Sequence, residues 1–130
     1  MELAVLTWLM VKHVVADYFL QTSWMIQEKA DYGKLGGIFH AGEHGILTAV
    51  TLWFFGVGWW IILFALIDCI LHYHIDWCKS NYLRGNFRFA PWPYDSEDPQ
   101  YWWAMGIDQF LHYMTYVLII ILIGAFGVIG

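Results

Sequence analysis

The sequence predicts an all-α fold: an integral membrane four-helix bundle with a polar core lined by His and Asp. Three observations lead to this prediction. Hydrophobic residues make up 60% of the 130 residues and charged residues only 13%, a balance that suits a bilayer better than water. Four apolar segments are each long enough to cross a bilayer, since a span needs roughly 20 residues. Each segment also carries two His or Asp residues four positions apart.

The predicted spans form a single transmembrane helical domain that takes up the whole chain, residues 1–130. The spans are predicted at about residues 3–24, 38–55, 59–79 and 101–123. None of them contains proline, which would interrupt a helix. The first segment has no basic region before it and no small-residue cleavage site after it, so we predict a retained span rather than a signal peptide.

The connections between the spans differ in length. A Gly-Val-Gly sequence at residues 56–58 joins the second and third spans so tightly that they must form an antiparallel hairpin. The longest connection, residues 80–100, contains all three prolines and mixes arginine with Phe, Trp and Tyr. This mixture is typical of the headgroup zone, so we expect an interfacial loop between the third and fourth helices. A lid over a site is the alternative.

Basic residues gather at one end of the predicted spans. They are Lys29 and Lys34 after the first span, and Lys79, Arg84 and Arg88 after the third. Because Lys and Arg concentrate in cytoplasmic loops, both termini are expected to face away from the cytoplasm. Lys12 differs, since it lies within a span and must reach the interface, pair with an acid or line a polar cavity.

Charge and cysteine content exclude two kinds of site. The formal net charge is -5 with only six Lys and Arg, so we predict no nucleic acid partner, because phosphate contacts need clustered basic residues. Cys69 and Cys78 lie nine positions apart in one hydrophobic segment, where they form neither a zinc CxxC motif nor a disulfide. We expect both to be small packing residues.

Four residue pairs carry the candidate chemistry. They are His13 with Asp17, His40 with His44, His72 with Asp76, and Asp108 with His112. An i, i+4 spacing places both side chains on one face of a helix, about one turn apart. Two ligands from one helix can then reach a common ion.

The four pairs are also predicted to lie at one depth in the bilayer. The first two pairs border the connection between the first and second spans, and the last two border the connection between the third and fourth. Both connections lie on the same side of the membrane. Ionisable residues inside a bilayer are costly and face the bundle interior, so eight of them in one layer indicate a shared metal site. A metal-free polar network is the alternative.

The charges of these residues favour two divalent ions. Three aspartates and a bridging hydroxide carry four negative charges, which two divalent cations neutralise, and a neutral cluster suits a low-dielectric site. Facing helices of a bundle are a known way to hold a dimetal centre. Mixed imidazole and carboxylate ligands fit zinc, manganese, iron or nickel, and the sequence does not choose among them.

Residues next to the pairs are candidates for supporting roles. Gln21 lies one turn beyond Asp17, and Gln109 follows a predicted ligand directly, so both are expected to support ligands or contact substrate. Asp68 either extends the stripe of His72 and Asp76 or pairs with Lys12 or His74.

Catalytic and substrate-binding residues are predicted from a motif and from position. Residues 40–44 match the H-x-x-E-H pattern of inverted zinc peptidases, in which the glutamate is the base, so Glu43 is a catalytic candidate through a weak motif. Lys79 is the second catalytic candidate. Arg84 and Arg88 lie near the expected mouth of the site, where they would hold an anionic group of the substrate.

The chain resembles an uncharacterised domain-of-unknown-function family of small polytopic, His/Asp-rich membrane proteins of bacteria and phages. The resemblance rests on H-V-V-A-D-Y-F-L-Q-T-S-W from His13 followed by Lys29, H-A-G-E-H from His40, H-Y-H-I-D-W-C-K from His72, and D-Q-F-L-H from Asp108. It implies a helical membrane protein with a polar core and brings no established activity. The chain is more loosely similar to bacterial inner-membrane proteins described as metal-dependent hydrolases, which implies a location in the bacterial inner membrane.

Taken together, these features favour a membrane-embedded dinuclear metal-dependent hydrolase that acts on a phosphoester or lipid-linked substrate at the cytoplasmic face. One alternative is a non-enzymatic metal-binding membrane protein: an ion carrier, a sensor or a structural metal site. Another is a phage factor that interacts with the host membrane. The expected partners are the lipid bilayer, a lipid or phosphorylated substrate, and a second copy of the chain in a homodimer.

Overall fold

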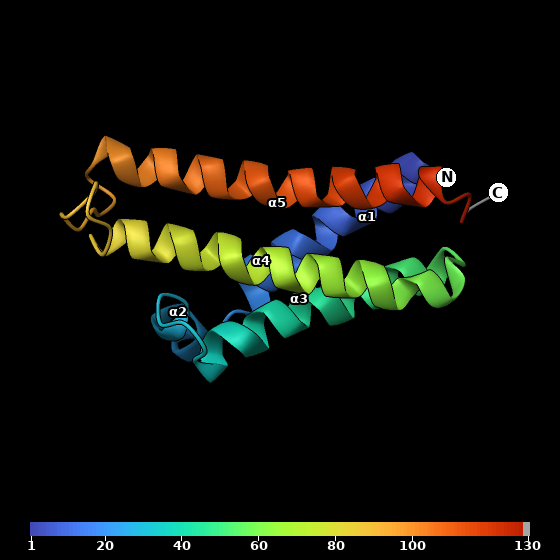
Figure 1. Ribbon diagram of the computed structural model, residues 1–130, viewed down its shortest axis with the longest axis horizontal. Helices are drawn as coiled ribbons and strands as arrows, with labels where there is room; N and C mark the ends of the chain where they lie inside the picture. The colour runs from blue at the N-terminus through green and yellow to red at the C-terminus, as the bar shows by residue number, and fades with distance from the viewer. Residues whose placement is uncertain (129–130) are drawn as a thin grey trace.

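The computed structural model describes residues 1–128, and within them the protein is all-α (Figure 1). Four long helices run through the molecule, and one short helix lies beside them. The helices are α1 (Glu2–Val15), α2 (Ser23–Glu28), α3 (Leu35–Phe54), α4 (Ile61–Leu83) and α5 (Pro99–Ala125), with a π-helix, η1 (Ala16–Leu20), after α1 and a 3-10 turn, η2 (Gly58–Trp60), before α4.

The first predicted span, residues 3–24, ends earlier than expected. α1 continues directly into the π-helix η1, which ends at Leu20 because the backbone of Gln21 is extended. Thr22 then begins α2, since its side-chain oxygen accepts a hydrogen bond from the Met25 amide at 3.3 Å. A π-helical turn carries more residues per turn than an α-helix and is frequent at functional sites. Asp17 lies on this turn.

Helices α3 and α4 form the antiparallel hairpin that the Gly-Val-Gly sequence predicts. They lie side by side along the molecule (Figure 1), and Gly56 and Gly58 both have positive φ in the turn between them. Gly45 allows the two helices to approach closely, because a Cβ atom at this position would lie 3.1 Å from the Ala65 carbonyl oxygen. The approach brings the imidazole rings of His44 and His72 into a stack with centroids 3.5 Å apart.

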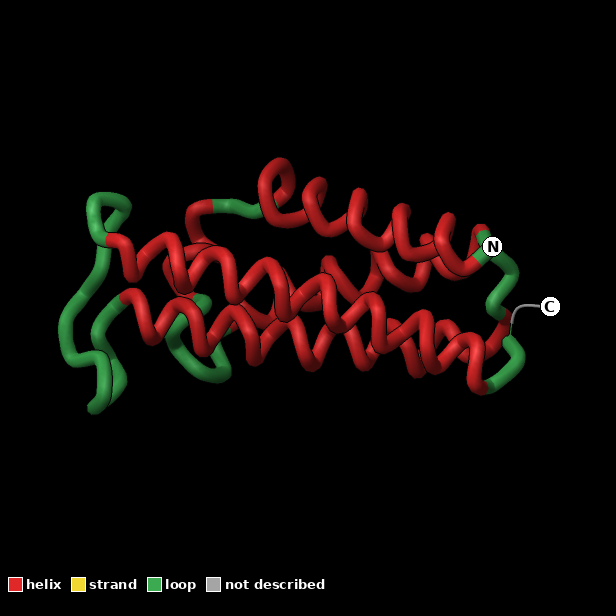
Figure 2. Tube along the Cα trace, turned by 90° about the horizontal axis from the view of Figure 1, so that it is seen from above, coloured by secondary structure: helices red, strands yellow, loops and turns green. Residues whose placement is uncertain are grey.

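Helix α5 returns along α4 and also packs on α1. The connection between α4 and α5 lies at the end of the molecule opposite the N-terminus (Figure 2). It carries exposed aromatic residues, with Phe89 79% and Trp92 71% exposed, as expected for an interfacial loop. α2 packs against the start of α3.

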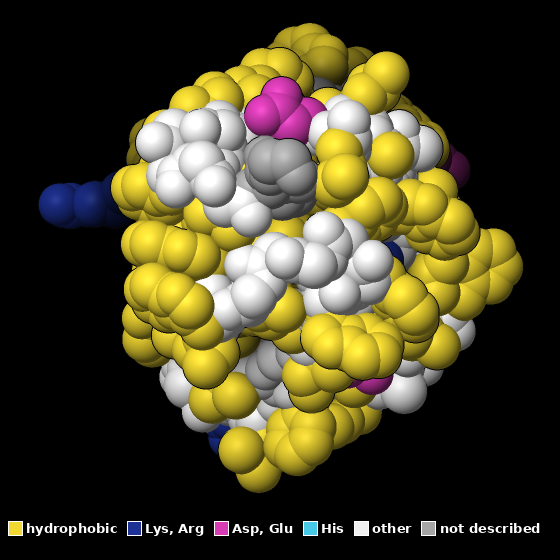
Figure 3. All heavy atoms as spheres, turned by 90° about the vertical axis from the view of Figure 1, so that its right-hand side faces the viewer, with side chains coloured by type: hydrophobic (Ala, Val, Ile, Leu, Met, Phe, Trp, Pro, Cys, Tyr) yellow, Lys and Arg dark blue, Asp and Glu magenta, His cyan; other side chains and the backbone are white. Residues whose placement is uncertain are grey.

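The buried apolar core lies toward the end that holds the N-terminus. Its members come from all four long helices and include Val5, Leu9, Leu52, Phe64 and Ile119. Hydrophobic side chains also cover the outside of this end (Figure 3). Large apolar residues are exposed along the helices as well, among them Phe19 at 78% and Ile62 at 70%. An apolar exterior around a polar interior suits a lipid environment.

Three helical segments of the described chain are long and apolar enough to cross a membrane: Glu2–Leu20, Gly58–Leu83 and Pro99–Ala125. The second predicted span, residues 38–55, forms a helix but is not among them. α3 contains four glycines, two histidines and Glu43 within 20 residues, which lowers its mean hydropathy. Polar and small residues that the site and the close helix packing require thus weaken the membrane signal of this helix.

Candidate metal centre

Eight buried or nearly buried His and Asp side chains meet between the four long helices. They include all four predicted pairs and form three overlapping groups whose potential ligand atoms lie within 4.8 Å of one another. The groups are Asp17 with His40, His44 and His72; His13 with His72 and His112; and Asp76 with Asp108 and His112. The histidines are at most 1% exposed, so the cluster is removed from the surface.

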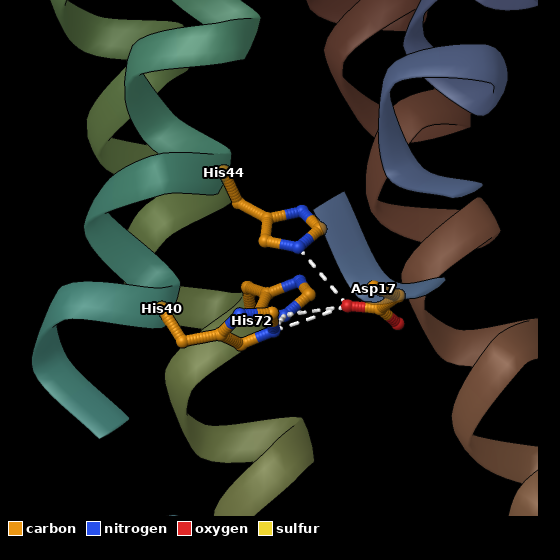
Figure 4. Close-up of side chains that lie close together, drawn as sticks. All are labelled: Asp17, His40, His44 and His72. Carbon is orange, nitrogen blue, oxygen red and sulfur yellow. Dashed lines mark hydrogen bonds and ion pairs between the residues drawn. The ribbon is translucent and has the colours of Figure 1, made fainter. Parts of the chain in front are cut away.

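In the first group, three imidazole rings converge on one carboxylate (Figure 4). His40 and His44 project from α3 and His72 from α4, and Asp17 faces them from the π-helical turn. The Asp17 Oδ1 atom lies 3.0 Å from His40 Nε2, 3.1 Å from His44 Nε2 and 3.7 Å from His72 Nε2. The Nε2 atoms of His40 and His72 are themselves 3.1 Å apart.

These separations have the size expected for the ligands of one metal ion. Ligand atoms at roughly 2.0–2.1 Å from a tetrahedral zinc ion lie about 3.3 Å from one another. The measured separations between Asp17 Oδ1 and the Nε2 atoms of His40, His44 and His72 scatter around this value. Three buried nitrogens and one nearly buried carboxylate oxygen are a donor set that suits zinc and other divalent transition metals.

Asp76 connects the first group to the third. Its Oδ2 atom lies 3.2 Å from His72 Nε2 and 3.4 Å from His40 Nε2, while its Oδ1 atom lies 3.7 Å from His112 Nε2. Asp108 Oδ1 lies 3.5 Å from the same His112 nitrogen. One carboxylate therefore faces both groups, one oxygen toward each.

The third group contains polar atoms that lack hydrogen bonds. Among residues 1–128, Asp108 Oδ1 and His112 Nε2 are buried and have no hydrogen-bond partner. Buried polar groups are normally satisfied. A cation between these two atoms would satisfy both, so the donors of this group also fit a metal ion.

Two lysines lie against the cluster and carry positive charge into it. Lys29 Nζ is 2.7 Å from Asp76 Oδ2, and the lysine is only 6% exposed. Lys79 Nζ lies 3.2 Å from both Asp76 Oδ1 and Asp108 Oδ2. The charge balance predicted from the sequence counted neither of them, and they give the site two further positive charges.

His13 is held on both sides by neighbouring side chains. Its Nδ1 atom lies 3.0 Å from the Tyr116 hydroxyl, and its Nε2 atom lies 3.2 Å from both Gln109 Oε1 and Asp17 Oδ2. Gln109 also donates to Asp108 Oδ2 at 3.1 Å. His13 and Gln109 thus connect the carboxylates of Asp17 and Asp108.

A buried ion pair lies next to the cluster on the side of the apolar core. Lys12 Nζ contacts Asp68 Oδ2 at 2.5 Å, and the Thr48 hydroxyl donates to the same oxygen at 2.5 Å. Lys12 Nζ also lies 3.3 Å from His44 Nδ1. Of the alternatives for Asp68, pairing with Lys12 is the one observed. Lys12 contacts Nδ1 of the His44 ring, whereas Nε2 of the same ring faces Asp17.

Four predicted site residues lie outside the cluster. Gln21 donates to the backbone oxygen of Asp17 at 3.1 Å. Glu43 is half-buried, and its Oε2 atom lies 3.8 Å from His40 Nδ1, on the side of the ring away from the converging Nε2 atoms. Arg84 contacts the Gln27 carbonyl and Asp31, and Arg88 is exposed in the interfacial loop.

Four residues that contact the cluster or the ion pair beside it were not predicted as site residues: Lys12, Lys29, Thr48 and Tyr116. Thr48 follows His44 by four positions and Tyr116 follows His112 by four, so extending the i, i+4 pattern by one turn would have found both. Lys29 carries no such signal. It follows the short helix α2, and only the folded chain brings it to Asp76.

The chain matches the family described as "Protein of unknown function (DUF3307)" over residues 5–128. It belongs to this family of unknown function. The match covers α3, α4, α5 and α1 from Val5 onward, and it includes every residue of the His/Asp cluster. No curated protein and no solved structure matches the chain.

Proposed function

We propose that this DUF3307 member is a membrane-embedded dinuclear metal-dependent hydrolase that cleaves phosphoesters at the cytoplasmic face. The observation that carries the proposal is the placement of Asp76, whose two oxygens face two separate groups of ligand atoms. A carboxylate between two ions a few ångströms apart is typical of two-metal hydrolases, in which the ions hold both oxygens of a displacement.

All four long helices cross the bilayer in this proposal. α3 is the least apolar of them, but its His residues face inward while Ile46 and Trp53 are 66% and 67% exposed on its outer surface. Lys29, Lys79 and the arginines of the interfacial loop lie toward one end of the helices. The positive-inside rule assigns this end to the cytoplasm and both termini to the opposite side.

The first and third groups of ligand atoms are suited to different roles. Asp17, His40, His44 and His72 supply four protein ligands, which is the number found in closed structural sites. Asp76, Asp108 and His112 supply three, which leaves a fourth position for water or substrate. An ion held by Asp76, Asp108 and His112 would supply hydroxide as the nucleophile near neutral pH.

Two residues beside the cluster would act on the substrate or on a ligand. Lys79 lies between Asp76 and Asp108 and is 15% exposed, so its ammonium group is placed to bind an anionic ester. Glu43 faces the outer nitrogen of His40, which suits orientation of that ring. The geometry therefore favours Lys79 over Glu43 for contact with substrate.

Metal content and hydrolysis test the proposal together. Protein in lipid nanodiscs should contain zinc, manganese, iron or nickel by elemental analysis and should hydrolyse 4-nitrophenyl phosphate until a chelator removes the metal. His44→Ala should lose metal and activity, and Asp108→Asn should lose activity while keeping the ion of the first group. His74→Ala is the matched control for metal content, because His74 lies on the exposed side of α4 and bonds Tyr32.

The proposal is wrong if metal-loaded protein shows no hydrolysis or if Asp108→Asn retains it. A thermal unfolding curve of each variant separates loss of chemistry from loss of fold. A structural metal site is the second candidate, and the closed four-ligand geometry of the first group favours it. In that case a chelator should lower the unfolding temperature, and no ester should be turned over.

A further inference from the structure

An apolar groove runs between α4 and α5 and ends at the candidate metal centre. Its volume is about 490 Å³, within the roughly 300–1,000 Å³ of small-molecule sites. Most of its wall is hydrophobic, and it includes Leu71, Ile75, Trp103, Ala104, Ile107 and Leu111. Two of its lining residues, Lys79 and Asp108, belong to the cluster.

The groove opens on the lipid-facing side of the helices. Trp103 and Ile107 on its rim are 62% and 60% exposed, and these side chains would contact lipid if the helices cross a bilayer. A second groove of about 540 Å³ lies between α1 and α3, but it reaches Lys12, whose ammonium group is held by Asp68. Of these two grooves, the one between α4 and α5 therefore joins lipid to ligand atoms.

The net charge of the site indicates the charge of the molecule that it binds. With two divalent ions, a hydroxide and three aspartates the cluster is neutral, and Lys29 and Lys79 then leave two positive charges unmatched. A phosphate monoester carries between about 1.5 and 2 negative charges at pH 7. A phosphomonoester therefore neutralises the loaded site, which a low-dielectric interior favours.

We infer that the substrate is a lipid phosphomonoester that enters sideways from the bilayer, with its alkyl chain in the groove between α4 and α5 and its phosphate at Lys79. This inference rests on the proposed hydrolase function. In the reaction, the hydroxyl of water adds to phosphorus and the bond from phosphorus to the alkyl oxygen breaks. The alkoxide takes the proton lost by the water, so the products are a long-chain alcohol and inorganic phosphate.

Chain length tests the groove as a substrate site. In nanodiscs, kcat/KM for alkyl phosphates should rise from butyl to dodecyl phosphate by about fourfold for each methylene that enters the groove. Ala104→Trp fills the groove and should lower kcat/KM for dodecyl phosphate by roughly 10- to 200-fold. The loss should be larger for dodecyl phosphate than for 4-nitrophenyl phosphate, which has no alkyl chain to place in the groove. Val50→Trp, in the groove between α1 and α3, is the matched control and should behave like the wild type.

Cys78 gives a readout that does not depend on turnover. This cysteine is exposed and lines the same groove, while Cys69 lies elsewhere. In a Cys69→Ala background, dodecylphosphonate should slow alkylation of Cys78 by N-ethylmaleimide, methylphosphonate should not, and Ala104→Trp should abolish the protection.

The possible outcomes separate the two proposals. If dodecylphosphonate does not protect Cys78, or if Ala104→Trp hydrolyses dodecyl phosphate as well as the wild type, the lipid inference is overturned while hydrolysis of 4-nitrophenyl phosphate still supports the hydrolase. If Cys78 is protected but neither ester is hydrolysed by metal-loaded protein, the hydrolase is wrong and the groove is a binding site for lipid phosphates.

Discussion

The two ends of the four long helices differ in the kind of residue that they bury. Toward the termini, α1, α3, α4 and α5 contribute Val5, Leu9, Leu52, Phe64 and Ile119 to an apolar core. Toward the loop between α4 and α5 the same bundle holds the His and Asp cluster with Lys29 and Lys79. Apolar packing holds helices together at little cost, whereas each buried ion costs several kcal/mol before its partners compensate. We therefore attribute the polar half to function rather than to stability of the fold.

The largest effect is expected where one residue connects both ligand groups. Asp76→Asn should remove both metal ions and lower hydrolysis by about a thousandfold or more, since it removes a charge shared by the whole site. It also leaves Lys29 and Lys79 with one carboxylate fewer, and breaking a buried pair costs about 3–5 kcal/mol. Elemental analysis and chemical unfolding measure the two effects. A variant that keeps two ions would show that Asp76 is not shared.

The boundary between the halves is the ion pair of Lys12 and Asp68. Lys12→Met should destabilise the fold by about 3 kcal/mol or more, because it leaves a buried aspartate unpaired. The double variant Lys12→Met with Asp68→Leu should recover most of this loss, since it removes both charges. Unfolding in denaturant compares the two. A double variant no more stable than the single one would mean that Asp68 is held by Thr48 rather than by Lys12.

In the apolar half, a cavity should lower stability and leave the site intact. Leu9→Ala should cost about 2–5 kcal/mol, the range for truncating a buried leucine. Metal content at saturation should stay the same. Ile62→Ala is the control, because its side chain is 70% exposed and faces outward. Loss of metal in a folded Leu9→Ala protein would contradict the separation of the two halves.

The smallest effect is expected at the hydrogen bond between Tyr116 and His13. Tyr116→Phe removes the hydroxyl that contacts His13 Nδ1 at 3.0 Å and should cost about 1 kcal/mol of stability. Hydrolysis should fall by less than about tenfold, because His13 acts on Asp17 through a further hydrogen bond. The measurement is kcat with metal in excess. A loss as large as that of Asp76→Asn would place Tyr116 among the reacting groups.

Much of the candidate site could be predicted because the helix repeat is regular. The spacing of His40 with His44, or of Asp108 with His112, places both side chains on one helix face before any tertiary contact forms. Their common depth followed from the order of the connections. The structure brings all eight residues together, although the sequence could not divide them into groups or show that Asp76 faces two of them.

Other features depend on contacts between segments distant in sequence. Asp17 lies on a π-helical turn that the sequence did not predict, although it still faces His13 as the i, i+4 spacing indicated. Lys29 reaches Asp76 across 47 positions of the chain. The charge balance deduced from the sequence omitted this contact, and with it part of the positive charge on which the inference of a phosphate ligand rests.

The sequence by itself determined the helical class, the apolar exterior and the identity of the polar pairs, because each depends on residue type and local spacing. The tertiary structure decided which oxygen meets which nitrogen, which lysines enter the cluster and where the groove between α4 and α5 meets the ligands. Those properties depend on how closely neighbouring helices approach and how each is rotated about its axis. A one-dimensional pattern limits these quantities without fixing them.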